Sequence, residues 1–381
     1  MLYSAPLLPE ETPLVIMAEG FLTSPNGKVA TGVLRYGRWP VVAVIDSSHA
    51  GQTTDIVLGF GKPVPIVAHL TEALKFQPAA LLLGTAPQGG GLPTAWKNLI
   101  EQAIQARLHV ISGLHDFIAD NPIWQSLAKQ NQVTLWDVRN TATPEMKALN
   151  RVAQLTPRPS HTRVVTMVGS DCAVGKMSVA LETAQAFRTS QFSAQHAALM
   201  VPTGQTGILI EGWGVPLDRM IGDFMAGAIE TCISQGIDRL TLSDPGKSHW
   251  LLVEGQGSLL HPGYSGVTMS LLHGSHPDAM ILCHKESGDK HIRGGYPVEI
   301  PTMQMLIQLY ETAAQWARDP NKPSARVVGI AVNTSALSES EATAILSQYK
   351  AETGLPVTDP VRYGAESLVK ALIQERNELS L

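Results

Sequence analysis

Residues 164–178 carry the clearest chemical signal in this sequence. Val164 to Val168 is an apolar and β-branched run that predicts a buried strand, and the loop GSDCAVGK follows at Gly169 to Lys176. Apolar residues at helical spacing continue from Met177 to Phe187. This succession of strand, glycine loop, Gly-Lys and helix is the pattern of a phosphate-binding loop (P-loop). In such a loop backbone N–H groups point at an anion and the lysine adds positive charge. We therefore predict a phosphate or other anion site here.

Two positions depart from the usual P-loop pattern. Ser170 stands where the first glycine is usual, and Met177 stands where a Ser or Thr usually holds Mg²⁺. The next hydroxyl, Ser178, lies about 100° further round the helix. Anion binding is therefore the firmer expectation, with Mg²⁺ a possible addition. The expected phosphate or nucleotide site comprises Gly169, Ser170, Asp171, Cys172, Ala173, Val174, Gly175, Lys176, Met177, Ser178 and, from a later strand end, Asn333.

Composition and charge restrict the class of protein. A chain of 381 residues exceeds the usual size of a single core, which predicts two domains. The net charge of −5, without a basic stripe, argues against a nucleic-acid or anionic-membrane partner. Three cysteines without metal-ligand spacing, no secretory signal and no apolar run of membrane-spanning length predict a cytoplasmic protein. We expect a homo-oligomer that acts on a small molecule.

Short apolar strands alternate with helical stretches in both halves of the chain, which predicts an α/β fold with mostly parallel sheets. No G-x-G-x-x-G follows the first strand, so an ordinary NAD site is not supported. A proline-rich stretch at 141–162 predicts the linker. The expected strands are Leu14–Met17, Val41–Ile45, Ile66–His69, Ala79–Leu83, Leu108–Ser112, Val133–Trp136, Val164–Val168, His196–Val201, Leu251–Glu254, Ala279–Cys283, Val327–Val332 and Leu355–Val357.

Acidic and imidazole groups follow the strands of the second half. Glu254 closes an apolar strand. In P-loop enzymes an acidic residue at such a strand end holds Mg²⁺ or activates water. Asp223 precedes an apolar helix and could be a second metal ligand, or a helix cap. His261 is the favoured general base because imidazole titrates near neutral pH, although a loop histidine bonded to backbone is equally expected.

Several polar residues are candidates for contacts with a substrate or a base. The loop at Pro202 to Gly207 suits a small polar substrate, or is a plain turn, and Asn333 could bind a nucleotide base or close a turn. The glycine-rich loop Gly84 to Gly91 is either a ligand loop or a flexible turn. The substrate candidates are Thr203, Gln205, Thr206, Arg219 and Arg362.

Six histidines in the second half could form a metal site only if two or three of them converge. The sequence around Gly274 and His276-Pro277 predicts a loop, which disfavours a shared helix face for His273 and His276. The six are His249, His261, His273, His276, His284 and His291.

Two family resemblances rest on these motifs. The loop Gly169 to Lys176 and the segment VEGQG at Val253 to Gly257 resemble G-T-D-T-x-V-G-K-T and V-E-G-A-G-G of dethiobiotin synthetase, an ATP-dependent ligase. Met177 replaces the Mg²⁺-binding Thr of that family. A broader resemblance is to the DUF1611 family, and its further segments are Asp223 to Glu230, Glu254 to Gly266, Leu272 to Ser275 and Thr358 to Gly364.

The DUF1611 resemblance implies an N-terminal Rossmann-like domain over 1–145 and a C-terminal P-loop NTPase-like domain over 146–381. Some members are described as D-glutamate N-acetyltransferases. The first hypothesis is therefore an N-acyltransferase that uses acetyl-CoA, in which Lys176 holds phosphates and His261 or Glu254 is the base. The alternatives are an ATP-dependent ligase or kinase, with Mg²⁺ on Glu254 and Asp223, and a nucleotide-binding regulatory protein.

Overall fold

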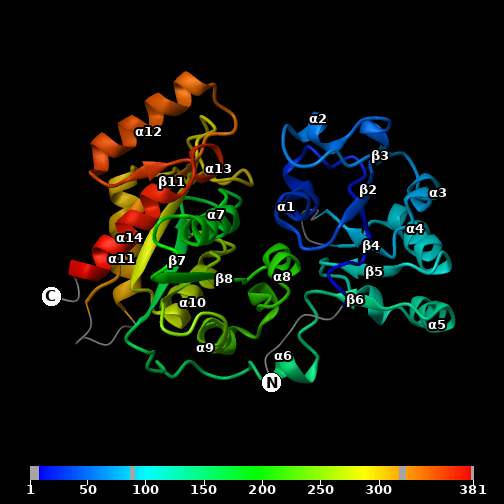
Figure 1. The fold of residues 1–381 in the computed structure, drawn as a ribbon, viewed down its shortest axis with the longest axis horizontal. Coiled ribbons are helices and arrows are strands. Elements are labelled where there is room, and N and C mark those ends of the chain that lie inside the picture. Colours follow the sequence, from blue (N-terminus) through cyan, green and yellow to red (C-terminus); the bar gives the residue numbers. More distant parts are fainter. Residues whose placement is uncertain (1–7, 86–90, 317–322, 379–381) are drawn as a thin grey trace. The chain divides into compact units, whose positions relative to one another are not determined.

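The structure is a computed structural model that describes residues 8–85, 91–316 and 323–378. The chain forms two compact units, and each contains one six-stranded parallel sheet (Figure 1). The first unit comprises residues 1–146 and 205–219, and the second comprises 147–204 and 220–381. The predicted α/β class with parallel sheets is confirmed, whereas the domain limits 1–145 and 146–381 stay a prediction.

The sheet of the first unit has the strand order β3-β2-β1-β4-β5-β6, and all neighbouring strands are parallel. This is the order of Rossmann folds, in which the winding reverses between β1 and β4. Each strand overlaps its predicted range. The strands are β1 (Leu14–Met17), β2 (Val41–Ile45), β3 (Ile66–Val67), β4 (Ala80–Leu83), β5 (His109–Ser112) and β6 (Leu135–Asp137).

Helices cover both faces of this sheet. Val15 and Met17 of β1 share a core with α3, α4 and α5, while Ile16 points to the other face, against Ala30 of α1. The elements are η1 (Pro25–Gly27), α1 (Lys28–Tyr36), η2 (Ser47–His49), α2 (Thr54–Leu58), α3 (Leu70–Ala73), η3 (Leu74–Phe76), α4 (Thr94–Gln105), η4 (Ile118–Asp120), α5 (Pro122–Asn131) and α6 (Pro144–Lys147). Of the predicted glycine-rich loop Gly84 to Gly91, residues 86–90 lie outside the described residues.

A segment from the second half of the chain completes the first unit. Residues 205–219 contain α8 (Gln205–Glu211) and η5 (Leu217–Arg219), and α8 packs on α1. Gly212 has a φ of 72°, in the left-handed region that favours glycine, and a Cβ there would also displace the guanidinium of Arg38, which would lie 1.6 Å away. The sequence predicted a plain turn or substrate loop at Pro202 to Gly207, whereas α8 begins at Gln205, because this short helix depends on packing.

The sheet of the second unit has the order β12-β11-β10-β7-β9-β8, again all parallel. β7, which leads into the P-loop, lies between β10 and β9, with Gly169 opposite Cys283. The strands, each overlapping its predicted range, are β7 (Thr162–Gly169), β8 (His196–Val201), β9 (Ser248–Val253), β10 (Ala279–Lys285), β11 (Arg326–Asn333) and β12 (Val357–Thr358).

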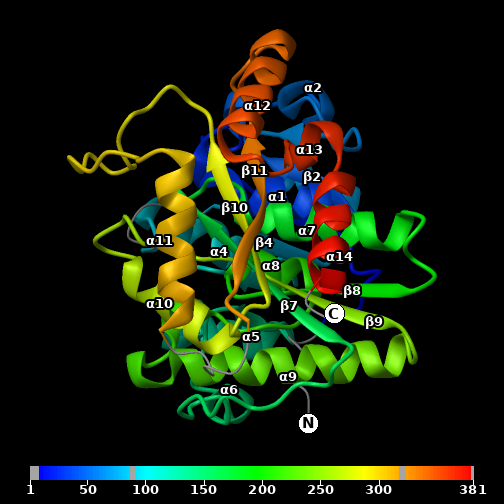
Figure 2. The ribbon, with the colours of Figure 1, turned by 90° about the vertical axis from the view of Figure 1, so that its left-hand side faces the viewer.

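Two groups of helices cover this second sheet. In Figure 2, α10 and α11 lie on the opposite side of the sheet from α7 and α14. Helix α12 begins with a capping box between Ser338 and Glu341 and packs on α11 and β12. The elements are α7 (Lys176–Thr189), η6 (Gly222–Phe224), α9 (Met225–Ser243), α10 (Ser265–Ser275), α11 (Met303–Gln315), α12 (Glu339–Thr353), α13 (Pro360–Tyr363) and α14 (Glu366–Glu378). Among the helices of the described ranges, none is long and apolar enough to cross a bilayer.

The prediction of a loop around Gly274 is wrong, because Ser265–Ser275 is helix α10. A Cβ at Gly274 would lie 2.3 Å from the backbone oxygen of Ala226 in α9. The glycine therefore marks a close crossing of two helices rather than a break. The helix ends at His276, whose φ of 42° is left-handed.

A buried tyrosine joins the P-loop strand to the rest of the second unit. The hydroxyl of Tyr310 in α11 donates to the carbonyl of Gly169 at 2.6 Å and accepts from the Leu259 N–H at 3.2 Å. Burial raises the pKa of this phenol, so it remains a neutral donor. Removing the hydroxyl would leave both backbone groups without this partner.

We predict that Tyr310→Phe lowers the free energy of unfolding by about 1–3 kcal/mol, because buried polar groups lose their partner. Urea denaturation measures the difference. Tyr363→Phe is the matched control, since that hydroxyl bonds Glu339 at the surface, and its effect should stay within about 0.5 kcal/mol. Equal effects of the two changes would contradict the role of Tyr310.

Candidate active site

The P-loop has the backbone of an anion cradle. β7 ends at Gly169 and α7 begins at Lys176, and the loop contains two left-handed residues, Ala173 with φ 55° and Gly175 with φ 105°. A left-handed conformation is uncommon for a residue other than glycine, and such strain is typical of functional loops. Because the first N–H groups of α7 have no partner within the helix, they can bind an anion in this loop.

Lys176 is more enclosed than its motif suggests. Its side chain is 6% exposed, and its ammonium donates to the carbonyl of Asp171 at 2.7 Å. Glycines make room for it: a Cβ at Gly255 would lie 2.6 Å from Lys176 Cδ, and one at Gly169 would lie 3.1 Å from Nζ. The positive charge is held inside the loop.

Asp171 anchors the loop with both carboxylate oxygens. Oδ1 accepts from the N–H of Cys172 at 2.6 Å, and Oδ2 accepts from the N–H of Arg293 at 2.7 Å. The side chain is buried. Asp171 thus ties the P-loop to the segment after β10 and fixes the backbone of the neighbouring cysteine.

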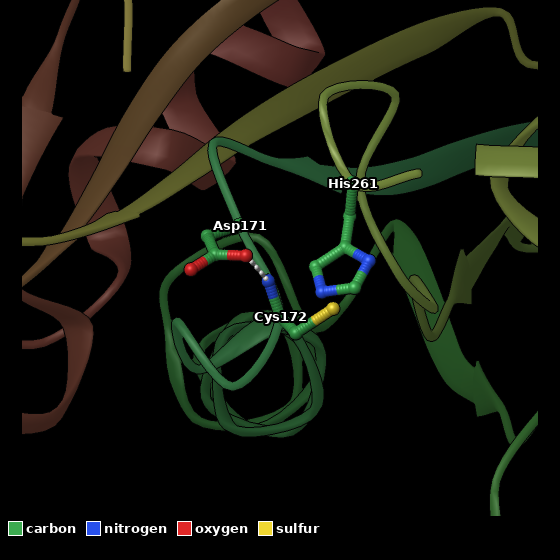
Figure 3. Close-up of side chains that lie close together, drawn as sticks. All are labelled: Asp171, Cys172 and His261. Carbon is green, nitrogen blue, oxygen red and sulfur yellow. Dashed lines mark hydrogen bonds between the residues drawn. The ribbon is translucent and has the colours of Figure 1, made fainter. Parts of the chain in front are cut away.

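A thiol and an imidazole meet at the P-loop. Figure 3 shows the ring of His261 directed at Cys172, with Asp171 beside them, and one ligand atom from each of the three lies within 4.8 Å of the others. His261 is 5% exposed, and its ring lies 4.4 Å from that of Tyr264 and 4.9 Å from that of Tyr296, measured between centroids. The structure therefore brings together two residues assigned separately from the sequence.

The tautomer of His261 follows from its local hydrogen bond. Nδ1 accepts from the N–H of Gly263 at 3.2 Å, so in the neutral ring we assign the proton to Nε2. The distal nitrogen is then a donor toward Cys172, not an acceptor. A general base at Nε2 would require a proton on Nδ1, where it would face the Gly263 N–H. The geometry therefore favours His261 as a donor.

The same geometry decides whether Asp171, Cys172 and His261 fit a metal ion. A histidine that binds a metal normally donates its other ring N–H to an acceptor, whereas Nδ1 of His261 faces a donor. Both oxygens of Asp171 already accept backbone bonds. These residues do not fit a resident metal. Among the described ranges, they are the one group of three or more potential ligands that the structure gathers, so the six histidines form no such group.

Glu254 holds the loop after β8. Its Oε2 accepts from the N–H groups of Thr203 at 2.9 Å and Gly204 at 3.1 Å, and Thr203 Oγ1 donates to the Glu254 carbonyl at 2.7 Å. Gln256 Nε2 donates to Thr203 Oγ1 at 3.1 Å. Asp223, its expected metal partner, is an exposed residue of η6 without a capping bond. These contacts favour a positioning role for Glu254.

The remaining phosphate-site candidates lie around the start of α7. Met177 and Ser178 are half-buried in its first turn. Asn333 ends β11; its Oδ1 accepts from the Ser335 N–H at 3.0 Å, and a Cβ at Gly175 would lie 4.0 Å from its Nδ2. Asn333 is therefore both a turn residue and a neighbour of the P-loop.

The substrate candidates divide between the units. Thr203 and Arg362 belong to the second unit, where the Arg362 guanidinium donates to the Leu337 carbonyl at 3.0 Å. Gln205, Thr206 and Arg219 belong to the first, where Gln205 is buried and Arg219 lies 4.9 Å over the Phe117 ring. Their roles stay predictions.

Sequence reasoning missed a polar chain behind the P-loop. Ser170 Oγ lies 2.8 Å from His284 Nδ1, His284 Nε2 lies 3.6 Å from a Glu286 oxygen, and the Tyr349 hydroxyl donates to Glu286 at 2.6 Å. The order Ser, His, Glu resembles a hydrolytic triad, but Ser170 is 0% exposed and cannot meet a substrate. This row of polar side chains fixes the P-loop instead. The position of His284, at the end of a strand next to β7, was the available signal.

The comparisons with known proteins agree with this architecture. A family model described as the P-loop domain DUF1611_C, of unknown function, matches residues 151–369, more than half of the chain. The chain belongs to the DUF1611 family. The Rossmann-like DUF1611_N model matches residues 47–141 of the same chain. The predicted combination of a Rossmann-like and a P-loop domain is confirmed.

Solved and curated relatives support the DUF1611 assignment. A DUF1611 family protein from Anabaena variabilis has a crystal structure that is 37% identical, with a TM-score of 0.80 over 96% of this chain and 100% of that one. The D-glutamate N-acetyltransferases of Tritonibacter scottomollicae and a Pseudoalteromonas species are 40% and 35% identical over 80% of this chain and 84% of their own length. The DUF1611 chain is thus similar to enzymes over most of its length.

We predict that Glu286 makes stability depend on pH. The hydrogen bond with His284, followed by that from Tyr349, lowers the pKa of Glu286 to about 2. A carboxyl group whose pKa is lower in the folded than in the unfolded chain stabilises the folded chain at every pH above the ordinary pKa of about 4.3. This contribution to the free energy of unfolding is lost as the pH falls toward 2. Glu286→Gln should therefore be less stable than the parent at pH 7, with the gap closing on acidification.

Urea titrations across that pH range measure the gap. The exposed Glu11→Gln is the matched control and should show no comparable gap at pH 7. A constant difference between Glu286→Gln and the parent at every pH would contradict the assignment.

Proposed function

We propose that this DUF1611 protein transfers the acetyl group of acetyl-CoA to the amine of D-glutamate or a closely similar amino acid. The observation that carries the proposal is the 40% identity, over 80% of the chain, to a D-glutamate N-acetyltransferase. The P-loop geometry supports it, because a loop of N–H groups with an enclosed ammonium suits the diphosphate of CoA.

Met177 favours an acyl donor over ATP. A phosphoryl-transfer P-loop relies on Mg²⁺ held by the hydroxyl after the lysine, and a thioether is a poor ligand for that hard cation. A CoA diphosphate is not broken in the reaction, so its binding needs no bridging metal. ATP with Mg²⁺ on Glu254 and Asp223 is the alternative. It is disfavoured because Glu254 already holds the backbone of Thr203 and Gly204.

The proposed reaction has three chemical requirements. The neutral amine must attack the thioester carbonyl, the developing oxyanion must meet donors, and CoA must leave as a thiolate that takes up the proton lost by the amine. His261 directs Nε2–H into the P-loop beside Cys172, where it can donate to a phosphate oxygen of bound CoA. Arg219 and Arg362 stay candidates for the carboxylates of the amino acid.

The test is thiol release from acetyl-CoA on addition of D-glutamate, with L-glutamate as the stereochemical control. We predict turnover that survives EDTA, is reduced only modestly by Ser178→Ala and is nearly unchanged by Met177→Thr, because no metal has to bind beside the lysine. The ligase or kinase alternative would be preferred if turnover required ATP and Mg²⁺, with ADP formed in step with product. Binding of nucleotides or CoA without turnover on any amino acid would favour the regulatory alternative.

A further inference from the structure

Three side chains of the first unit bury polar atoms that have no hydrogen-bond partner among the described residues. The carboxamide of Gln205, in α8, uses neither its oxygen nor its nitrogen, although the residue is only 3% exposed. Thr85, which follows β4, is 1% exposed with an unused hydroxyl, and the buried Nε of Arg139, which follows β6, is also unused. Buried polar atoms without partners are costly, so each of them needs an explanation in a native protein.

The three side chains gather at the carboxyl ends of β4, β5 and β6. A Cβ at Gly113, which follows β5, would lie 1.5 Å from Oε1 of Gln205, so the carboxamide rests directly on the Gly113 backbone. The guanidinium of Arg139 donates through Nη1 to the carbonyl of Gly113 at 2.7 Å. The parallel register of β4 and β5 brings Thr85 level with the segment after Gly113. Open α/β sheets bind ligands at this edge.

Charged groups surround these polar atoms. Nη2 of Arg139 pairs with Oδ2 of Asp218 at 3.0 Å, and the guanidinium of Arg219 lies 4.9 Å from the centroid of the Phe117 ring. Burial lowers the pKa of Arg139, Asp218 opposes this shift, and the charge of Arg219 adds to it, so the three groups act on one another. Both guanidinium groups remain protonated. The edge therefore presents two cations suited to carboxylates, one carboxylate suited to an amine, and a carboxamide.

An imidazole lies beside Asp218 without neutralising it. Nε2 of His115 is 3.7 Å from Oδ2 of Asp218, but burial, followed by the charge of Arg139, lowers the pKa of this ring. The ring is therefore uncharged at neutral pH. Both contacts of Asp218 in the described part of the chain use Oδ2, so Oδ1 can accept from an amine.

The same unit lacks the features of a dinucleotide site. In such folds an acidic residue at the end of the second strand binds the ribose. Asp46 has this place after β2, but it is 0% exposed, and its Oδ1 accepts from the N–H groups of Gly20 and Ser48, each at 3.1 Å. Its Oδ2 lies 2.9 Å from Nδ1 of His49. The ribose-binding group is thus occupied, whereas the unused polar atoms lie at β4, β5 and β6.

We propose that the first unit binds the acceptor amino acid, an amino dicarboxylate, at this edge of its sheet. This inference rests on the proposed transferase function. Arg139 and Arg219 bind the two carboxylates, with the more exposed Arg219 on the carboxylate of the amino acid's side chain. Asp218 accepts from the amine. The Gln205 carboxamide donates to a carboxylate through nitrogen and accepts from the amine through oxygen.

This assignment divides the two substrates between the two units of the chain. The P-loop of the second unit holds the diphosphate of CoA, and the polar edge of the first unit holds the amino acid. A change at this edge therefore alters the affinity for the amino acid and leaves that for the acyl donor as it is.

Calorimetric titration of the full chain with D-glutamate, at saturating CoA, tests the site together with the KM of each substrate. In Gln205→Met, which removes the polar atoms at similar volume, the Kd of D-glutamate should rise about 10- to 100-fold, as expected for lost hydrogen bonds to a charged ligand. The KM of acetyl-CoA should be unchanged. The melting temperature should equal or exceed that of the parent, because unpaired buried polar atoms are removed. Gln102→Met, at an exposed position of α4, is the matched control and should keep the parent's Kd.

Two analogues assign the charged contacts. D-Alanine lacks the side-chain carboxylate of D-glutamate, and glutarate lacks its amine. Arg219→Met should lower the affinity for D-glutamate to about that for D-alanine, and Asp218→Asn should remove the preference for D-glutamate over glutarate. Preferences that match the parent's in both variants would overturn the assignment.

The outcomes also separate this inference from the function on which it rests. Turnover of D-glutamate by the parent, with unchanged Kd and KM in Gln205→Met and Arg219→Met, would overturn the site and leave the transferase standing. Binding of D-glutamate that these variants weaken, without any thiol release from acetyl-CoA, would support the site and overturn the transferase. Neither binding nor turnover of D-glutamate would overturn both.

Discussion

The hydrogen bond from the Lys176 ammonium to the Asp171 carbonyl closes the P-loop on itself, and the rest of the candidate site depends on it. A buried ammonium is costly unless its donors are used, so the loop must keep a carbonyl at this point. The glycines at 169 and 255 leave the room that the lysine stem needs. The result is a fixed positive charge next to backbone N–H groups, which an incoming anion can share without a large rearrangement.

Neighbouring elements keep this loop in one shape. Tyr310 holds the carbonyl at the end of β7, and Asp171 ties the loop to the segment after β10. Ser170 is bonded to His284, which is in turn paired with Glu286. The partners of the loop lie in α11, in β10 and in the segment after β10, and not in the loop itself. Cys172 therefore has a defined place, and His261 can be directed at it.

The sequence predicted the strands and the P-loop because both have local signals. Buried parallel strands are short apolar runs, and the glycines and lysine of the loop stand at fixed spacing. Helix α10 was not predicted because Gly274 reads locally as a break, whereas it serves a close crossing with α9. The addition of α8 to the first unit depends on packing against α1, which no local pattern contains.

The candidate site likewise has features that local sequence predicts and features that only the fold determines. The types of its residues were predictable, but their pairing was not. Ser170 is distant in the chain from His284, and Cys172 from His261, so each pair comes together only in the folded protein. The hydrogen bond from the N–H of Gly263 to Nδ1 of His261 favours a donor role for this ring over the predicted base role, which stays untested. Such a contact is visible only once the backbone of the loop is known.

The central claim is that this loop holds the diphosphate of an acyl donor. Its most direct test is calorimetric binding, in the presence of EDTA, of CoA and of pantetheine, which lacks the diphosphate together with the 3′-phosphoadenosine, in the parent chain and in Lys176→Met. The account predicts that CoA binds about 10- to 100-fold more tightly than pantetheine, as expected for one or more charge-assisted hydrogen bonds. It also predicts that Lys176→Met removes most of this preference while pantetheine affinity is kept. Equal affinities for the two ligands, or an unchanged preference in Lys176→Met, would contradict the account.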